Sequence, residues 1–286
     1  MLRLDRKRII THRGLEPDKP NFFPESSLEA FSDHLSRGFG IEFDPNWTRD
    51  NIVVWHDELL KRASGESDTR KLRNITALEI PERIPTLQKI FDLIRHSQSQ
   101  INALHYKGKY QNDEDLQRFI TVLSQNTDIL TRLLIFDVKP ETASKLLKAF
   151  PQIQLAPSVA HPYDVKRFNG SSSNTLLTIE EAEGLLKKGA YGKHPWVWLD
   201  EWDLTDQNGG QKKFYTEDVF TKMRKAGAKI SLVTPELHGT SPGLYGGESH
   251  PDARTQKRLF TRISEIISLE PNAICTDHPE AFAKPL

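Results

Sequence analysis

The sequence predicts an α/β fold, a single (β/α)8 TIM-type barrel. The chain has 286 residues, close to the ~250 typical of such a barrel. Short apolar runs rich in β-branched residues alternate with segments whose apolar residues recur at helical spacing, which is the pattern of repeated βα units. The two Gly/Ser-rich stretches, 169–174 and 239–247, are short enough to be barrel loops. Residues 1–286 are therefore expected to form one domain.

Eight barrel strands can be assigned along the chain, with an extra extended run, 52–56, close behind the second of them. The strands are expected at 8–12, 40–44, 101–107, 133–138, 154–159, 196–200, 229–234 and 273–276. Helices are expected at 27–36, 87–96, 114–125, 140–149, 179–188, 217–226 and 254–269. Several of these helices begin with a hydroxyl residue suited to cap the first turn, namely Ser26 or Ser27, Thr86, Thr178 and Thr216.

The composition argues against several classes of protein. The 39 basic and 39 acidic side chains balance, so the chain has no overall field to hold nucleic acid. The single cysteine, Cys275, excludes an internal disulfide and a multi-cysteine zinc site. No stretch approaches the ~20 apolar residues that span a membrane, and residues 1–11 are charged, unlike a secretory signal. We expect a cytoplasmic protein without stable membrane insertion.

Polar side chains stand where several expected strands end. In a parallel barrel these ends meet on one face, which carries the active site. This face would bring together histidines, carboxylates, a lysine and an arginine, and a phosphodiester requires such a set. Its anionic oxygens need cations, while the attacking and leaving oxygens need a proton acceptor and a proton donor. The residues are His12, Arg13, Glu42, Asp44, His56, His105 and Lys107.

Glu42 and Asp44 have the spacing of a cation site. Alternate residues of a strand point the same way, so both carboxylates can reach one hard cation. Cys275, in an apolar strand, is expected to belong to the core.

The motifs around these residues resemble the glycerophosphodiester phosphodiesterase family in order and spacing. They are His12-Arg13-Gly14, Pro24-Glu25-Ser26-Ser27-Leu28-Glu29-Ala30-Phe31, Glu42-Phe43-Asp44, Thr48-Arg49-Asp50, Val53-Val54-Trp55-His56-Asp57 and Thr276-Asp277-His278-Pro279. The resemblance implies a divergent member of the phosphatidylinositol phospholipase C-like phosphodiesterase barrels, acting in lipid metabolism on a small-molecule phosphodiester.

The resemblance also implies roles for individual residues. His12 and His56 would be the catalytic acid/base pair. Arg13 and Lys107 would bind the phosphate, and Glu25 would support the pocket. Glu42 and Asp44 would hold a divalent cation: magnesium, manganese or calcium.

The third strand departs from the family pattern, which usually has Glu-x-Lys where this chain has His105-Tyr106-Lys107. His105 is a candidate third metal ligand, and imidazole favours borderline metals over calcium or magnesium. A hydrogen-bonding role for His105, or a position left to water, stays open. Trp198 is a candidate substrate contact because aromatic faces suit glycerol or sugar, with packing as the alternative.

Other readings of the sequence also stay open. Asp200, Glu236 and His238 follow later strands and are candidates either for substrate or metal contact or for loop capping. Two rival functions remain: a phosphodiesterase or lyase for a phosphodiester-linked sugar polymer or its precursor, and a non-catalytic barrel that binds phosphate esters. The sequence carries no sign of the oligomeric state.

Overall fold

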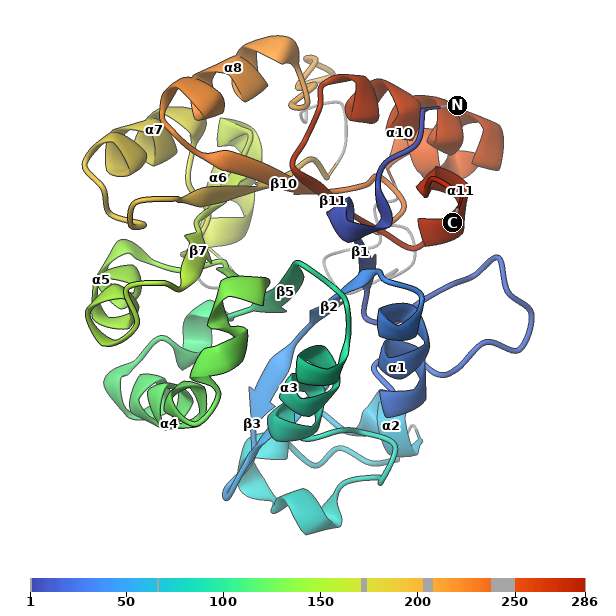
Figure 1. Ribbon diagram of the computed structural model, residues 1–286, viewed down its shortest axis with the longest axis vertical. Helices are drawn as coiled ribbons and strands as arrows, with labels where there is room; N and C mark the ends of the chain where they lie inside the picture. Colours follow the sequence, from blue (N-terminus) through green and yellow to red (C-terminus); the bar gives the residue numbers. More distant parts are fainter. Residues whose placement is uncertain (1, 66, 171–173, 203–207, 238–249, 286) are drawn as a thin grey trace.

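A parallel β-barrel ringed by helices forms the centre of the molecule (Figure 1). The computed structural model describes residues 2–65, 67–170, 174–202, 208–237 and 250–285. The sheet order is β7-β6-β5-β2-β1-β11-β10-β9-β8, and every neighbouring pair is parallel. The predicted TIM-type barrel is confirmed. Its strands are β1 (Ile9–His12), β2 (Gly40–Phe43), β5 (Asn102–His105), β6 (Leu133–Phe136), β7 (Gln154–Ala156), β8 (Ser158–Ala160), β9 (Trp196–Asp200), β10 (Lys229–Val233) and β11 (Ala273–Thr276).

These nine strands occupy eight positions because β7 and β8 are two halves of one bent strand. Only Pro157 separates them, and proline has no N–H to donate to a ladder. β7 pairs with β6, while β8 pairs with β9. The amide of Trp198 donates to the carbonyl of Pro157 at 3.0 Å. The strand expected at 154–159 therefore bends at Pro157 and closes the ring.

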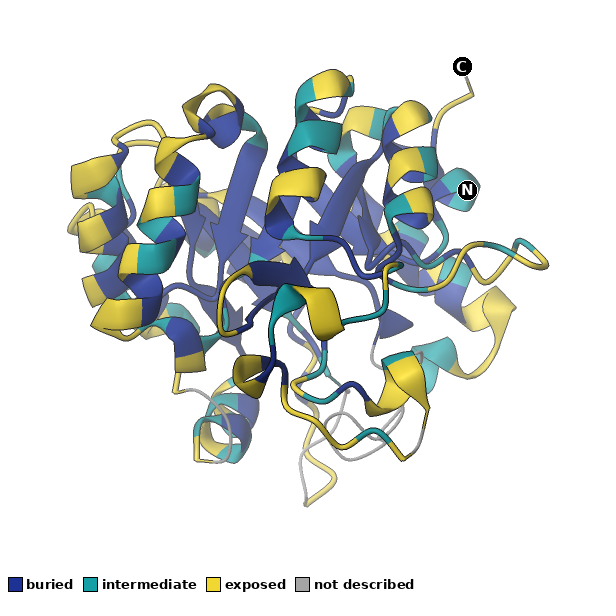
Figure 2. Cartoon of the chain, turned by 90° about the horizontal axis from the view of Figure 1, so that it is seen from below, coloured by how far each residue is buried: buried dark blue, intermediate teal, exposed yellow. Residues whose placement is uncertain are grey.

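The helices cover the outside of the barrel and turn their buried sides inward, as the burial colours of Figure 2 show. Ser27, Thr86, Thr178 and Thr216 cap their helices as the sequence suggests, since each side chain accepts a first-turn N–H. The helices are α1 (Leu28–Ser36), α2 (Lys61–Ser64), α3 (Leu87–His96), α4 (Asp113–Ser124), α5 (Pro140–Ala149), α6 (Pro162–Asn169), α7 (Ile179–Lys187), α8 (Glu217–Lys225), α10 (Gln256–Ser268) and α11 (Pro279–Phe282).

The described residues also form several short 3-10 helices. They are η1 (Arg6–Arg8), η2 (Leu72–Asn74), η3 (Ala77–Glu79), η4 (Gly108–Tyr110), η5 (Thr127–Arg132) and η6 (Pro251–Arg254). The loop expected at 239–247 lies outside the described residues, as do residues 171–173 of the one at 169–174. None of the helices in the described ranges is long and apolar enough to cross a membrane.

The extended run that follows β2 leaves the barrel as a hairpin. β3 (Pro45–Trp47) pairs antiparallel with β4 (Ile52–Val54). The chain then returns, and the amide of Trp55 donates to the carbonyl of Asp44 at 3.0 Å. This bond places His56 directly beside the end of β2.

Apolar side chains fill the inside of the barrel. Phe136 and Trp198 stack with ring centroids 3.9 Å apart, and Cys275 is fully buried in the same cluster. The expectation that Cys275 belongs to the core is confirmed. A second apolar layer lies between the strands and the surrounding helices, so the polar side chains gather at the strand ends.

Candidate active site

Asp44, directly after β2, is the centre of the charged cluster. Its Oδ2 lies 3.0 Å from Arg13 Nε, and its Oδ1 lies 2.9 Å from His105 Nδ1 and 3.3 Å from Lys107 Nζ. Burial alone would raise the pKa of Asp44, but Lys107, His56 and Arg13 outweigh it and hold that pKa well below its usual value. The carboxylate therefore stays ionised and ties three strand ends together.

Glu42 lies beside Asp44 in a different electrostatic state. Burial and the neighbouring charge of Asp44 raise the pKa of Glu42 to about 7. Its Oε2 is buried and has no hydrogen-bond partner among the described residues. A buried carboxylate oxygen without a partner costs free energy unless a cation or a proton satisfies it.

His12 ends β1 and is the register partner of Glu42 on β2. Its Nδ1 lies 3.1 Å from Oδ1 of the fully buried Asp277. Glu236 orders the chain around Asp277, since its Oε1 accepts from the Asp277 amide at 3.1 Å and from the Thr276 hydroxyl at 2.5 Å. Burial, followed by Asp277, raises the pKa of Glu236. Asp277, in the motif at residues 276–279, thus orients the His12 ring.

His56 is held by its own neighbour in the sequence, since its Nδ1 lies 2.8 Å from Asp57 Oδ1. Its carbonyl accepts from Lys107 Nζ and, at 3.2 Å, from Asn46 Nδ2. Burial is the main cause that lowers the pKa of His56 to about 3, and the charges of Arg13 and Lys107 add to it. The imidazole is therefore neutral at neutral pH and suited to accept a proton.

A left-handed turn after β1 places Arg13. Arg13 and Gly14 have φ angles of 50° and 71°. The Arg13 amide donates to the carbonyl of Glu42 at 3.1 Å. A Cβ on Gly14 would lie 2.8 Å from the Cβ of Ala30, so a larger residue would push α1 away. Arg13 Nη1 lies 3.4 Å from Glu25 Oε1, and the role of Glu25 in supporting the pocket stays a prediction.

His105 ends β5, and both of its ring nitrogens face carboxylates. Nδ1 faces Asp44, and Nε2 lies 3.4 Å from Asp137 Oδ2. Burial would lower the pKa of His105, but Asp137 and Asp44 raise it to about 9. Phe136 stacks on the imidazole at 4.8 Å, and Trp198 in turn stacks on Phe136. Trp198 is only 2% exposed, so its geometry favours the packing alternative, and its substrate contact stays a prediction.

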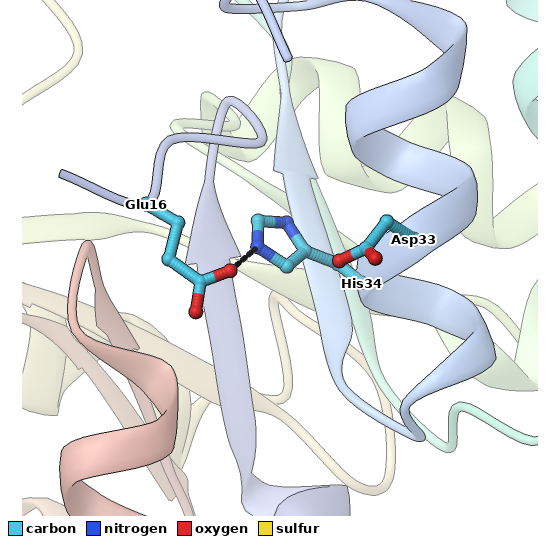
Figure 3. Close-up of side chains that lie close together, drawn as sticks. All are labelled: Glu16, Asp33 and His34. Carbon is cyan, nitrogen blue, oxygen red and sulfur yellow. Dashed lines mark hydrogen bonds and ion pairs between the residues drawn. The ribbon is translucent and has the colours of Figure 1, made fainter. Parts of the chain in front are cut away.

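Among the residues that the structure describes, two groups of side chains have their ligand atoms within 4.8 Å of one another, as a metal site requires. The mouth cluster consists of Glu42, Asp44 and His105, as the sequence suggests. The lateral cluster, beside α1, consists of Glu16, Asp33 and His34 (Figure 3).

The sequence reasoning did not assign several residues that hold the site. Asp57 directly follows His56, and Asp277 lies in the motif at residues 276–279, so both could have been found by asking which carboxylate lies beside each of these two imidazoles. Asp137 stands at the end of β6, where the same question applies to His105. Of the three later candidates, Asp200 ends β9 and is partly buried. Glu236 accepts hydrogen bonds from Thr276 and Asp277, and His238 lies outside the described residues.

The model of the glycerophosphoryl diester phosphodiesterase family matches residues 12–168, which is more than half of the chain. The chain belongs to this family. As a member, the protein is a phosphoric diester hydrolase, and the resemblance drawn from its motifs is confirmed. The match begins at the last residue of β1 and ends within α6, and it includes His12, His56 and all three residues of the mouth cluster.

Solved structures of the family share the fold of the whole chain at low identity. A glycerophosphoryl diester phosphodiesterase from Parabacteroides distasonis is 18% identical with a TM-score of 0.62, and the match covers 98% of this chain and 87% of that one. A phosphodiesterase from Oleispira antarctica, in complex with the product sn-glycerol-3-phosphate, is 15% identical with a TM-score of 0.61, over 96% and 94%. A glycerophosphodiester phosphodiesterase from Agrobacterium tumefaciens is 15% identical with a TM-score of 0.59, over 97% and 99%. Among curated proteins, no sequence matches significantly.

Proposed function

We propose that this family member is a divalent-metal-dependent phosphodiesterase that hydrolyses a glycerophosphodiester to glycerol phosphate and a free alcohol. One observation carries the proposal. His12 and His56, each with Nδ1 against an aspartate, lie around the buried pair of Glu42 and Asp44. The Oleispira antarctica neighbour, described in complex with sn-glycerol-3-phosphate, supports glycerol phosphate as the product.

The two histidines would move the protons. Each aspartate holds Nδ1 of its histidine and so leaves Nε2 as the atom that exchanges a proton with substrate, the arrangement found in other aspartate–histidine pairs. Neutral His56 would take a proton from the attacking hydroxyl. Attack by water would give the phosphate monoester directly, whereas attack by a neighbouring glycerol hydroxyl would give a cyclic phosphate that water then opens to the monoester. His12 would give a proton to the leaving alcohol. General acid–base catalysis of this kind typically contributes ~10²–10⁴-fold.

Arg13 and Lys107 would bind the phosphate. Both lie against Asp44, at 3.0 and 3.3 Å, in a buried setting where a charge-assisted hydrogen bond is strong. The contacts of Arg13 with Glu25 and of Lys107 with the His56 carbonyl fix both side chains before substrate arrives. Positioning of this kind lowers the entropic cost of binding.

The mouth cluster fits a divalent cation. Glu42 and Asp44 are oxygen donors and His105 adds a nitrogen, while the unpartnered Oε2 of Glu42 is satisfied when a cation is bound. The 2.9 Å between His105 Nδ1 and Asp44 Oδ1 also suits two ligands of one ion, because atoms ~2.1 Å from an ion and at right angles lie about 3 Å apart. When bound, the cation would withdraw charge from a phosphoryl oxygen.

The test is a phosphodiester assay on metal-stripped protein with glycerophosphocholine and glycerophosphoethanolamine as probes. We expect turnover to stop with chelator and to return better with manganese or cobalt than with calcium, because imidazole raises affinity along the transition series. Phosphorus NMR should show a phosphate monoester. A stable cyclic phosphate would indicate a lyase instead. Binding of glycerol phosphate without turnover under any metal would indicate a non-catalytic barrel.

A further inference from the structure

The imidazole of His105 is fixed on three sides. Nδ1 faces Asp44 at 2.9 Å, Nε2 faces Asp137 at 3.4 Å, and the ring lies on Phe136 with an interplanar angle of 10°. The orientation of the ring is therefore set by one carboxylate of the mouth cluster and by one carboxylate outside it.

The backbone holds Asp137 firmly in this position. Asp137 is 6% exposed and has a φ of 66°, a left-handed conformation that aspartate and asparagine tolerate better than most residues. The side-chain amide of Gln111 donates both to the carbonyl of Asp137 at 2.7 Å and to the carbonyl of Tyr106 at 2.8 Å. Gln111 thus ties the residue after His105 to Asp137, so the end of β5 and the end of β6 keep their spacing.

A histidine that ligates a metal through one ring nitrogen usually donates its other N–H to a carboxylate, which fixes the tautomer and the ring direction. We propose that Asp137 is the positioning residue of the metal site and directs Nδ1 of His105 toward Glu42 and Asp44. This inference rests on the proposed function, in which the mouth cluster holds a divalent cation. Asp137 would then help to set the preference of the site for a metal that accepts nitrogen.

The lateral cluster supplies a matched control. Asp33 also lies beside a histidine and a glutamate, but Arg37 pairs with Asp33 at 2.6 Å and with Glu16, so cations already satisfy that group. Asp33→Asn removes a carboxylate of the same type outside the barrel mouth. We expect it to leave metal binding unchanged.

The experiment measures manganese affinity directly, by calorimetric titration of the full metal-stripped chain. Asp137→Asn keeps a residue that tolerates positive φ and removes only the charge, and thermal unfolding checks that the variant is folded. We expect Asp137→Asn to weaken manganese binding by ~10–100-fold. Asp33→Asn should match the wild type, and His105→Ala should weaken binding at least as much as Asp137→Asn.

A second comparison, in the His105→Glu variant, shows whether Asp137 acts through His105 or supports the metal site in another way. In His105→Glu the ligand has no ring N–H to donate, so adding Asp137→Asn should bring no further loss of manganese affinity. If the aspartate change weakens binding equally in both backgrounds, or leaves the wild-type affinity unchanged, Asp137 does not act through His105 and the inference is wrong. If the wild-type chain binds no manganese, the proposed metal-dependent function fails together with the inference.

Discussion

The mouth cluster and the lateral cluster have the same composition and different chemistry. Each contains two carboxylates and one histidine whose ligand atoms lie within 4.8 Å of one another. The mouth cluster stands at the ends of β2 and β5, inside the barrel opening. The lateral cluster joins α1 to the loop after β1 (Figure 3). Residue types alone would rank the two as equal candidates for a metal site.

The cations around each cluster make the difference. In the lateral cluster, Arg37 Nη1 donates to Glu16 Oε1 at 3.2 Å, and His34 Nε2 lies 3.1 Å from Glu16 Oε2. Burial alone would raise the pKa of Glu16, but His34 and Arg37 lower it to about 2. Burial, followed by the charge of Arg37, lowers the pKa of His34. In the mouth cluster, Glu42 keeps an unpartnered oxygen and a pKa raised to about 7.

The two clusters differ in whether their carboxylate oxygens already have hydrogen-bond or ion-pair partners. The carboxylate of Glu16 has both oxygens bonded, so binding a cation there would first require Arg37 to leave. Glu42 Oε2 has no hydrogen-bond partner among the described residues. A carboxylate pair with an unpartnered oxygen, close to two oriented histidines, is suited to bind a cation and to take part in a reaction. A cluster whose carboxylates are already paired with cations is suited to stabilise the fold.

The largest contrast is expected between the histidines of the two regions. His12→Ala and His56→Ala should each lower kcat by ~10²–10⁴-fold because each removes a proton-transfer partner. His34→Ala should leave kcat near that of the wild type and lower the unfolding temperature, because Glu16 loses a buried partner. Steady-state assays with glycerophosphocholine and thermal unfolding of the three variants check this. Near-wild-type turnover in His12→Ala or in His56→Ala would show that the histidine concerned is not catalytic.

A smaller effect is expected on stability from Glu16→Gln. Hydrogen bonds to charged groups contribute about 1.5–3 kcal/mol, and Arg37 keeps Asp33 and Glu280 as partners. We therefore expect a loss near the lower end of that range, measured by urea unfolding at neutral pH.

The pH dependence of that loss follows from the lowered pKa of Glu16, about 2 against a reference of 4.5. The stabilisation by Glu16 is present above pH 4.5 and disappears as the pH falls toward 2. The stabilities of the wild type and of Glu16→Gln should therefore converge across that window. A gap that stays constant with pH would show that the charge of Glu16 does not stabilise the fold.

Much of the barrel could be predicted because its strands are short apolar runs with helical periods between them. The bend at Pro157 was missed because local sequence does not show which neighbour each half of a strand pairs with. The run at 52–56 reads as extended, but only tertiary pairing with Pro45–Trp47 makes it a hairpin outside the barrel. α6 was not predicted from the sequence; it spans eight residues, of which only Asp164 and Phe168 are buried.

Some residues of the candidate site could also be predicted from the sequence, and others could not. Motif spacing identified His12, His56 and the carboxylates of β2, which lie within one match to the family. The aspartates beside the histidines are spread along the chain. Asp57 directly follows His56, whereas Asp277 is 265 residues from His12 and Asp137, beside His105, follows another strand. These last two contacts depend on the closed ring. The lateral cluster was not predicted from the sequence, because the approach of Glu16 to α1 and its pairing with Arg37 are properties of the fold.

We propose that the mouth cluster, and not the lateral cluster, holds the metal on which turnover depends. The most direct test is a manganese titration of metal-stripped Glu42→Gln and Glu16→Gln side by side, with phosphodiester turnover measured at each metal concentration. We predict that Glu42→Gln loses tight manganese binding and turnover, while Glu16→Gln keeps both. Wild-type manganese affinity and turnover in Glu42→Gln, with loss of both in Glu16→Gln, would contradict the account.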